Sequence, residues 1–404
     1  MAIFDVEGVL IPKNRFLFEV GKNLCFSQLM RVLLFGFLYA VGGISLKSAL
    51  KHIFSNLRGA KVEWLMQTAE KAEIIPEAKE LFLQLKAQGC KTALVSSGIP
   101  APIVKRLATK LGADSGFGFD VAVSNNILTG EICGDVIERN GKLKVITQVL
   151  AAEKLSPVDC AVIADDRNNA SMFLPEIRKV GYNPDFRIIL KADAVVTGKL
   201  SKILPAINGQ PVVRTLPSRN DYLRELIHGS GAFVPVICSL MGVFSVVLAI
   251  SAVSAIYALS ELLRIEGRSM PLISGVTRHS ASQTELYEFT GAPLYFASGI
   301  LITLLFFQAP ISSAAIAIFA LGDSTASIFG SLIPAKFLPF TKGKTLGGSL
   351  AGFFFALIAG VFFLPPLYAL VGAAIAMAIE CLPLPINDNV LIPLGVATAL
   401  ALII

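Results

Sequence analysis

In the first half of the chain, apolar and polar residues alternate between strand-like and helix-like patterns. Short apolar runs bounded by polar, glycine or proline residues are typical of strands, and they occur at residues 2–4, 91–96, 159–164 and 186–190. Helical periodicity lies between them, at residues 76–88, 101–111 and 143–152. Strands that alternate with helices predict an α/β, Rossmann-like domain with a parallel sheet and right-handed crossovers.

Residues 14–75 interrupt this alternation with a mostly helical pattern, which predicts a helical cap inserted after the first strand. The insert contains an unusually apolar stretch at residues 32–46. This stretch is shorter than the ~20 residues that a membrane-spanning helix needs. A packed pair of cap helices is therefore favoured, and a hairpin that dips into a membrane is the alternative.

Long apolar blocks dominate the second half, at residues 231–263, 291–307, 311–333, 345–364, 366–382 and 389–404. Each block is close to the ~20 residues needed to cross a bilayer, except the first. That block is long for one crossing and short for two, and we expect it to cross twice with a short first helix. The pattern predicts an all-α, polytopic membrane domain with six or seven transmembrane helices.

Composition supports a division into two domains. The chain has 404 residues, 54% of them hydrophobic, and a mean hydropathy of +0.68, which excludes a disordered chain. The last 185 residues hold only 7 Lys and Arg and 9 Asp and Glu, whereas the rest of the chain is charged like a soluble domain. We expect a soluble domain at 1–204, a proline-containing linker at 205–220 and the membrane domain at 221–404.

Charge also bears on partners and location. The net charge of +6 is spread through the first half, which is not the pattern of a nucleic-acid-binding protein and weakly favours an anionic membrane surface. If each apolar block crosses the bilayer once, one face carries the basic residues Arg264, Arg268, Arg278, Lys336, Lys342 and Lys344. The positive-inside rule makes that face cytoplasmic. We therefore expect a multi-pass protein of the cell membrane with its N-terminal domain in the cytoplasm.

Polar side chains follow several predicted strands of the first domain. Asp5 and Glu7 come directly after the first strand, Ser96 ends the second, and Asp165 follows a third. Lys142 opens a helix. The carboxyl ends of parallel strands meet at one edge of a sheet, where such sheets bind ligands. A carboxylate nucleophile, a second acid, a hydroxyl, a lysine and an acid for Mg²⁺ are what metal-assisted phosphoryl transfer needs.

These motifs resemble the haloacid dehalogenase superfamily of phosphatases, particularly its phosphoserine-phosphatase-like branch, over about residues 1–200. The resemblance implies that Asp5 is the aspartyl-phosphate nucleophile and a Mg²⁺ ligand. Glu7 would be the acid/base and offer its backbone carbonyl to Mg²⁺. Ser96 would hold the phosphoryl group, Lys142 would neutralise it and Asp165 would complete the metal site. The substrate would be a small phosphorylated molecule.

The sequence departs from the family pattern at two places. The acid/base position is normally Asp, and Glu7 adds one methylene. Asn169 stands where a second acid is common, and Asp166 is a possible replacement for that acid. An alternative reading is therefore a catalytically slow domain kept for binding or regulation.

Charged residues are rare in the second half, and charges inside lipid are costly enough to be functional candidates. The candidate residues are Arg224, His228, Arg264, Asp323, Lys344, Gly347, Gly348, Glu380 and Asp388. Gly343-Lys344-Thr345 is not a nucleotide-binding P-loop, because Leu338 occupies a position where that motif needs glycine. Acids for a metal and Gly/Lys for phosphates on one cytosolic surface would suit phosphoryl transfer from a soluble nucleotide to a membrane alcohol.

Residues 222–404 resemble the polyprenol kinase family, which includes dolichol kinase, phytol kinase and the CTP-dependent diacylglycerol kinase. The resemblance implies CTP as the phosphoryl donor and a lipid alcohol as the acceptor. It suggests Asp323 and Asp388 as metal or acid/base candidates and Lys344 as a phosphate ligand. The substrate- and nucleotide-binding candidates are Arg224, His228, Arg264, Gly347, Gly348 and Glu380.

The sequence therefore favours a bifunctional membrane protein, a phosphatase-like domain fused to a lipid kinase that phosphorylates a long-chain isoprenoid alcohol. Two alternatives stay open. One is a membrane-anchored phosphatase, directed at phosphoserine-like or lipid phosphates, whose membrane half is not catalytic. The other is a transporter with a regulatory domain.

Overall fold

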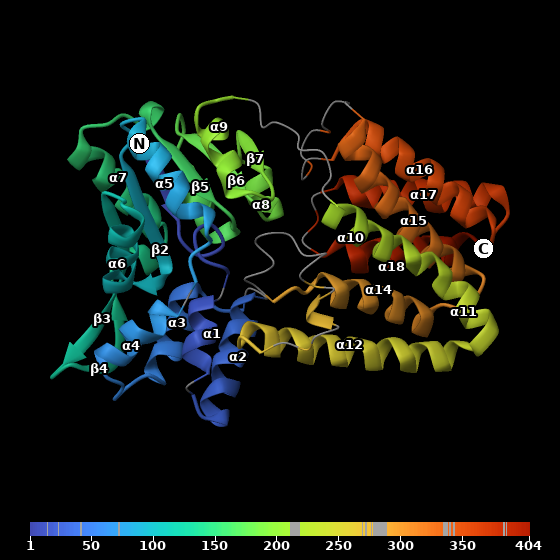
Figure 1. Ribbon diagram of the computed structural model, residues 1–404, viewed down its shortest axis with the longest axis horizontal. Helices are drawn as coiled ribbons and strands as arrows, with labels where there is room; N and C mark the ends of the chain where they lie inside the picture. Colours follow the sequence, from blue (N-terminus) through green and yellow to red (C-terminus); the bar gives the residue numbers. More distant parts are fainter. Residues whose placement is uncertain are drawn as a thin grey trace. The chain divides into compact units, whose positions relative to one another are not determined.

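The computed structural model describes residues 1–13, 15–22, 24–40, 43–71, 73–210, 219–268, 270, 273–275, 277, 289–333, 338, 341, 344–382, 384 and 386–404. The chain divides into two compact units, Met1–Val212 and Val213–Ile404, each with its own apolar core (Figure 1). Half of the expected linker, at 211–218, lies outside the described residues. So do three of the basic residues behind the orientation prediction, Arg278, Lys336 and Lys342.

A seven-stranded sheet in the order β4-β3-β2-β1-β5-β6-β7 forms the centre of the first unit. The strands are β1 Ala2–Asp5, β2 Thr92–Pro100, β3 Ser115–Ser124, β4 Ile127–Cys133, β5 Ala161–Ala164, β6 Arg178–Tyr182 and β7 Ala194–Val196. Neighbouring strands are parallel except for the antiparallel hairpin β3–β4. The predicted parallel α/β sheet is confirmed. Because β1 pairs with both β2 and β5, the chain reverses its direction across the sheet there, which is where such folds place their sites.

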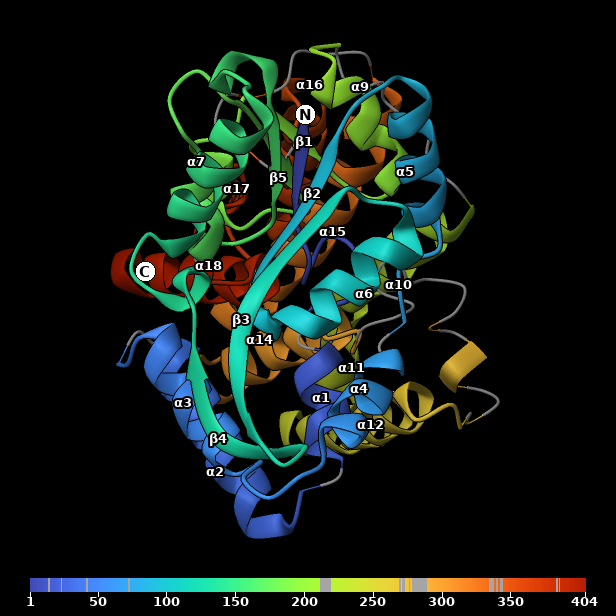
Figure 2. The same cartoon turned by 90° about the vertical axis from the view of Figure 1, so that its left-hand side faces the viewer.

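Helices cover both faces of this sheet. They are α5 Glu77–Ala87, α6 Ala101–Leu111, α7 Gly141–Glu153, α8 Phe186–Ile189 and α9 Ile203–Ile207. Figure 2 shows α5 and α6 on one side of the strands and α7 on the other. Short 3₁₀ turns lie at Asp135–Ile137, Pro157–Asp159, Arg167–Met172 and Leu200–Lys202. The three helices predicted between the strands are confirmed within a few residues.

The predicted strand at residues 186–190 is wrong, because Phe186–Ile189 forms helix α8. The reason is the preceding Asp185, whose carboxylate accepts hydrogen bonds from the backbone N–H groups of Arg187 and Ile188 at 3.0 Å each. This is a helix-starting arrangement, and it outweighs the β-branched content of the run. The sheet also contains strands β3, β4, β6 and β7, which the apolar pattern did not predict.

The region predicted as a helical cap contains four helices, α1 Arg15–Gly21, α2 Phe26–Ala40, α3 Leu46–Ser55 and α4 Val62–Glu70. Helix α3 contacts β4, and the chain after it joins the hairpin through backbone hydrogen bonds, such as Gly59 N–H to Leu128 O at 2.9 Å. Figure 2 shows the β3–β4 hairpin extending from the sheet to these helices. The cap is therefore anchored to the sheet domain by this hairpin.

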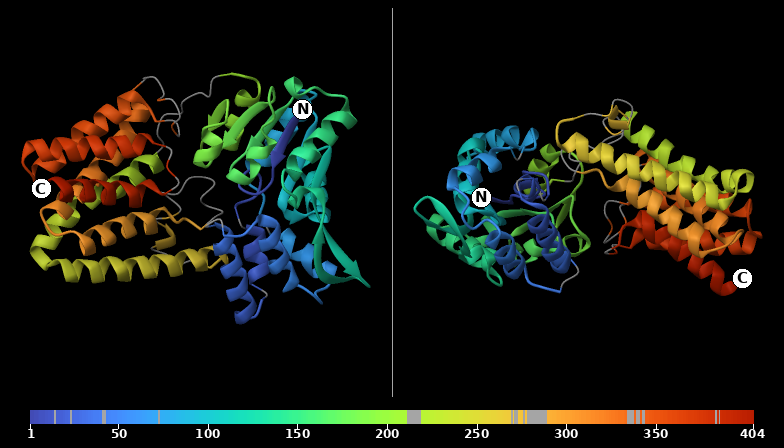
Figure 3. Two further views of the ribbon diagram at one scale, coloured as in Figure 1. Left: turned by 180° about the vertical axis from the view of Figure 1, so that it is seen from behind. Right: turned by 90° about the horizontal axis from the view of Figure 1, so that it is seen from below.

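Every named element in the described residues of the second unit is a helix, which confirms the predicted all-α region. Its helices are α10 Arg219–Gly229, α11 Val234–Met241, α12 Val243–Ile265, α14 Ala292–Phe306, α15 Ile311–Leu332, α16 Leu346–Val361, α17 Pro366–Cys381 and α18 Asp388–Ile403, with a 3₁₀ turn at Ser230–Phe233. Helix α15 contacts α10, α16, α17 and α18, and Figure 3 shows the helices side by side. Gly242, with φ +82°, divides the first long apolar block into α11 and α12, as its length predicted.

Two described helices, α12 and α15, are long and apolar enough to cross a membrane. Four other apolar helices, α14, α16, α17 and α18, have 15 or 16 residues. At ~1.5 Å per residue they extend about 24 Å, which is less than the ~30 Å of a hydrocarbon core. The prediction of six or seven transmembrane helices is therefore not confirmed.

Candidate functional site

Asp5 lies at the carboxyl end of β1, and its side chain is almost fully buried. Lys142, the second residue of α7, places its Nζ 2.6 Å from Asp5 Oδ1. The amide Nδ2 of Asn169 donates to Asp5 Oδ2, also at 2.6 Å. Gly141 permits this approach of α7, because a side chain there would overlap the carbonyl of Asp135. Both carboxylate oxygens of Asp5 are therefore held in a fixed orientation.

Two further carboxylates lie beside Asp5. Asp165 directly follows β5, and Asn169 Nδ2 donates to its Oδ1 at 2.9 Å and to Asp166 Oδ1 at 3.2 Å. Lys13 Nζ lies 3.0 Å from an oxygen of each aspartate. Burial raises the pKa of Asp165 well above its ordinary value, and the charge of Asp166 adds to this shift. Burial would also raise the pKa of Asp166, but Lys13 holds it below its ordinary value.

Glu7 lies in the loop after β1, and its carboxylate lies against Gly98, where any side chain would overlap it. Its Oε1 is buried and accepts no hydrogen bond. Burial, and then the negative charge of Asp5, raise the pKa of Glu7 to about 7. A carboxyl group with this pKa is protonated about half of the time at neutral pH, which suits a general acid and base.

Ser96 lies in β2, one residue beyond the position that pairs with Asp5 in the parallel register. Its side chain is buried, and its Oγ accepts a hydrogen bond from Gly98 N–H at 3.2 Å. Five residues predicted from the sequence, Asp5, Glu7, Ser96, Lys142 and Asp165, therefore lie on elements that meet at the carboxyl edge of the sheet.

The acidic residues fit a magnesium ion by their chemistry. The amide nitrogen of Asn169, Nδ2, donates hydrogen bonds to one oxygen of Asp5 and one oxygen of Asp165, so these two oxygens converge on one point. Carboxylate oxygens are the ligands that Mg²⁺ prefers. In the described part of the chain, no three acidic, histidine or cysteine side chains already surround a common ion position, because Asn169 and Lys13 lie between the carboxylates. The metal roles of Asp5, Glu7 and Asp165 stay predictions.

Sequence reasoning missed two cap contacts and two central residues. Tyr39, in α2 of the cap, donates from its hydroxyl to Asn168, and Arg167 donates to the Tyr39 carbonyl at 3.0 Å. Lys13 had no motif to mark it. In the sequence, Asn169 was notable only because an acid is common at its position. In the structure its amide forms hydrogen bonds with three aspartates and Lys142.

A second polar cluster lies among the helices of the second unit. His228 of α10 places Nδ1 3.2 Å from Asp323 Oδ2 of α15. Lys344, just before α16, lies 3.6 Å from Asp323 Oδ1 and pairs with Glu380 of α17. Asp388, the first residue of α18, lies within electrostatic range of Lys344 and Glu380. All five were predicted from the sequence, and they come from separate segments.

Arg224 reaches the edge of this cluster. Its guanidinium lies 3.2 Å from Glu225 Oε1, and the same oxygen accepts a hydrogen bond from Ser327 Oγ of α15 at 3.0 Å. The other oxygen of Glu225 lies 4.0 Å from His228 Nδ1. Glu225 was not among the predicted site residues, and the structure places its carboxylate between Arg224 and His228.

Two residues predicted to bind a nucleotide, Arg264 and Gly348, make contacts within the second unit. Arg264 forms a bidentate ion pair with the fully buried Glu261, at 2.8 and 3.0 Å. The carboxylate of Glu261 also accepts a hydrogen bond from Thr290 N–H. Gly348 donates its N–H to Thr345 at 3.1 Å, and a side chain there would overlap the backbone of α15. Its absence of a side chain therefore permits close packing on α15, and the phosphate contacts of Gly347 and Gly348 both stay predictions.

The sequence model of the haloacid dehalogenase-like hydrolase family matches residues 2–171, which include Asp5, Ser96, Lys142 and Asp165. The first unit is therefore similar to haloacid dehalogenase-like hydrolases. Phosphoserine phosphatase of Archaeoglobus fulgidus is 31% identical over 161 residues, which are 40% of this chain and 45% of that protein. Phosphoserine phosphatase of Methanocaldococcus jannaschii is 26% identical over 141 residues, or 35% of this chain and 66% of that protein.

This chain therefore spans less than half the length of the Archaeoglobus relative. A solved structure described as a phospho-aspartyl intermediate analogue of phosphoserine phosphatase is 21% identical, with a TM-score of 0.44. That similarity covers 52% of this chain and 98% of the other.

Proposed function

We propose that the haloacid dehalogenase-like unit hydrolyses phosphomonoesters through a covalent phosphate on Asp5. The observation that carries this proposal is the arrangement around Asp5, whose carboxylate is held by Lys142 and Asn169 while Glu7, with a pKa of about 7, lies two residues away. A fixed carboxylate beside a group that can give and take a proton suits nucleophilic catalysis.

In the first step, a carboxylate oxygen of Asp5 forms a bond to phosphorus while the bond from phosphorus to the ester oxygen breaks. Glu7 donates its proton to the departing alcohol oxygen. In the second step, a water oxygen attacks phosphorus, Glu7 takes the proton from that water, and the bond to Asp5 breaks to release inorganic phosphate. Lys142 neutralises charge on the phosphoryl oxygens. Mg²⁺ held by Asp5 and Asp165 would supply further positive charge.

The test is phosphate release by the full chain from a panel of phosphomonoesters, with and without Mg²⁺. Asp5→Asn should lower the rate at least ~10³-fold, because it removes the nucleophile. Asp159→Asn is the matched control, because Asp159 is exposed at the opposite end of the sheet, just before β5. Wild-type protein that releases no phosphate from any ester would favour the binding or regulatory reading.

For the second unit, we propose transfer of a phosphoryl group from CTP to a long-chain isoprenoid alcohol in the cell membrane. CTP and the alcohol follow from the resemblance to polyprenol kinases. The cluster of His228, Asp323, Lys344 and Glu380 supports the proposal, because it gathers acids and a cation on separate helices. A nucleotide with its metal would bring positive charge to the acids and phosphates to Lys344.

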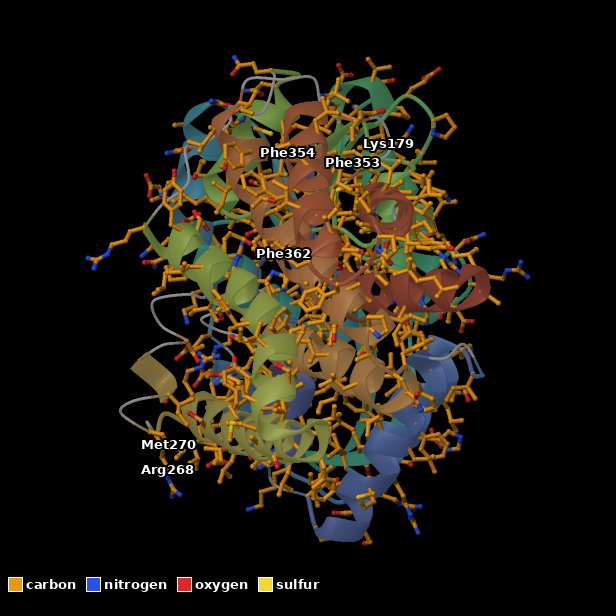
Figure 4. The ribbon with its side chains drawn as sticks, turned by 90° about the vertical axis from the view of Figure 1, so that its right-hand side faces the viewer. Lys179, Arg268, Met270, Phe353, Phe354 and Phe362 are labelled. Carbon is orange, nitrogen blue, oxygen red and sulfur yellow. The ribbon has the colours of Figure 1, made fainter. Side chains whose placement is uncertain are left out.

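Exposed apolar side chains support a bilayer as the surroundings of this unit. Phe354 of α16 is 57% exposed and Phe362, at its end, is 80% exposed; both are labelled in Figure 4. Leu240 of α11 and Phe244 of α12 are 80% and 81% exposed. Soluble monomers rarely expose so many large apolar groups together. The proposed location is a multi-pass position with the first unit on the cytoplasmic side.

The kinase test measures labelled phosphate in the lipid phase after incubation of the full chain with CTP and prenols or diacylglycerol. Asp323→Asn and Lys344→Ala should each lower transfer at least ~10²-fold. Glu266→Gln and Arg268→Ala are the matched controls, because both residues are exposed after α12. Arg268 is labelled in Figure 4. Wild-type protein that labels no lipid with CTP, ATP, GTP or UTP would favour the anchor or transporter.

A further inference from the structure

A cavity of about 560 Å³ lies between the cap helices and the sheet domain of the first unit. Phe16 of α1 and Ile74 line it from the cap side. Ile99 of β2 and Ile103 and Leu107 of α6 line it from the sheet side. Its volume falls within the ~300–1,000 Å³ of pockets that hold small molecules.

Two residues of the cavity wall, Ile99 and Ile11, adjoin residues of the proposed catalytic site along the backbone. Ile99, in its wall, is the next residue after Gly98, against which the carboxylate of Glu7 lies. Ile11, also in the wall, accepts a hydrogen bond from Gly8 N–H at 2.8 Å, within the loop that carries Glu7. A group bonded to the ester oxygen that Glu7 protonates would therefore be next to this space.

Three charged side chains line the cavity, Glu70, Arg106 and Lys110, and all three are exposed. Glu70 and Arg106 form an ion pair with each other, and their side chains are 49% and 60% exposed. An amino-acid phosphoester carries an ammonium and a carboxylate, and burying these groups is costly without dedicated partners. The carboxylate could pair with Lys110, but the ammonium would need Glu70, which is already paired with Arg106. The wall of Phe16, Ile99 and Ile103 needs no such rearrangement to hold hydrocarbon.

From this wall we infer that the phosphatase substrate is a phosphomonoester with a hydrocarbon chain, such as an isoprenoid or alkyl monophosphate, and that the chain occupies the cavity. This inference rests on the proposed phosphomonoester hydrolysis at Asp5. It favours an apolar ester over the phosphoserine on which the named relatives act.

The first experiment compares kcat/KM for geranyl phosphate, ethyl phosphate and O-phosphoserine, with the full chain in lipid nanodiscs. Each buried methylene contributes a factor of about 4 to binding, so burying four gives roughly 10². We expect geranyl phosphate to exceed O-phosphoserine by at least that factor. Equal values, or a preference for O-phosphoserine that Asp5→Asn abolishes, would overturn the inference and leave phosphomonoester hydrolysis in place.

The second experiment changes the cavity wall. Leu107→Trp fills the space with an apolar group, and Ile103→Glu places a charge in it. Each should lower the ratio of geranyl to ethyl phosphate kcat/KM at least about tenfold, by removing the burial of two or more methylenes. Leu83→Glu is the control, because Leu83 on α5 is 59% exposed and lies outside the cavity wall. An unchanged ratio in both cavity variants would contradict the inference.

A third measurement does not depend on turnover. The Asp5→Asn protein should bind decylphosphonate at least about 10² times more tightly than ethylphosphonate, and Leu107→Trp should reduce that difference. Affinity independent of chain length would overturn the inference even in a protein without hydrolysis. Tail-dependent binding with no hydrolysis of any ester would instead support the cavity assignment and count against the proposed phosphatase.

Discussion

The two polar clusters of this chain differ in how deeply their lysines are enclosed. In the first unit, the side chains of Lys142 and Asp5 are 4% and 6% exposed. In the second unit, Lys344 and Asp323 are 27% and 16% exposed, and their Nζ–Oδ1 distance is 3.6 Å. The first cluster is a closed network that already fixes the orientation of Asp5, the proposed nucleophile. In the second cluster Lys344 and Asp323 are more exposed, although Glu380, the other partner of Lys344, is fully buried.

The largest expected effect comes from replacing the lysine of each cluster, which should abolish one activity and leave the other. Lys142→Ala removes the cation on Asp5, and it should lower phosphate-ester hydrolysis by at least about 10³-fold while lipid labelling from CTP stays unchanged. Lys344→Ala should have the reverse pattern. The measurement is both assays on both variants of the full chain. Loss of both activities in either variant would contradict two independent sites.

The difference between the clusters also explains what the sequence could predict. In the first unit, Asp5, Ser96 and Asp165 were found because parallel strands end at one edge, a rule that needs no knowledge of the helices. Strands β6 and β7 were missed because Arg178 and Lys179 begin the former and the latter has three residues. Neither has the long apolar run that predicts a strand.

In the second unit, helix ends were predicted closely, because long apolar blocks separated by polar residues mark them. Asp323 and Lys344 were chosen because a charge among apolar residues is costly. The same reasoning selected Arg264, whose partner turned out to be Glu261, three residues earlier on the same helix. The free-energy cost of burying a charge shows only that the charge needs a partner. It does not show whether that partner is a bound ligand or a residue of the same helix.

The next prediction concerns Asn169, which links the carboxylates of the closed cluster. Asn169→Asp would restore the acid common at this position but would remove the amide donor and add a negative charge beside Asp5 and Asp165. Without metal, the variant should lose about 3 kcal/mol of unfolding free energy, and Mg²⁺ should restore part of it. Urea unfolding followed by the fluorescence of Trp64, the single tryptophan, reports on the first unit.

Asn208→Asp is the matched control, because Asn208 is exposed at the end of α9. It should change neither the unfolding free energy nor its response to Mg²⁺. An Asn169→Asp protein that is as stable as wild type in a chelator would contradict the network described here.

Glu7 provides a pH-dependent test of how deeply the first cluster is buried. Its pKa is about 7 in the folded unit against an ordinary 4.5, so the folded state holds more protons between these values. The free energy of unfolding should therefore fall as pH rises from about 4.5 to about 7 and stay lower above it. Glu7→Gln removes this cost, and in a chelator it should be up to about 3 kcal/mol more stable than wild type at pH 8 but equal at pH 4.

The control for this comparison is Glu131→Gln, which changes an exposed glutamate on β4. It should show no pH-dependent gain. A Glu7→Gln gain that is the same at pH 4 and pH 8 would mean that lost charge burial is not its cause.

The smallest expected effect concerns the contact between the cap and the closed cluster. The Tyr39 hydroxyl donates to Asn168, whose amide donates to Asp166 Oδ2 at 3.2 Å, so one chain of hydrogen bonds joins α2 to the site. Tyr39→Phe should cost about 1 kcal/mol of unfolding free energy. If the enzyme is active only while the cap contacts the site, kcat/KM for phosphate esters should fall about fivefold. A loss of about 1 kcal/mol lowers the equilibrium constant for that contact by this factor.

Tyr182→Phe distinguishes this role from simple stabilisation. The Tyr182 hydroxyl donates to Gly198 O at 2.8 Å, in the same unit. We expect the two variants to lose similar stability, measured by urea unfolding with Trp64 fluorescence, and only Tyr39→Phe to lose activity. Equal activity losses in both variants would show that Tyr39 acts through stability alone. Hydrolysis at Asp5 would then not depend on the contact between Tyr39 and Asn168.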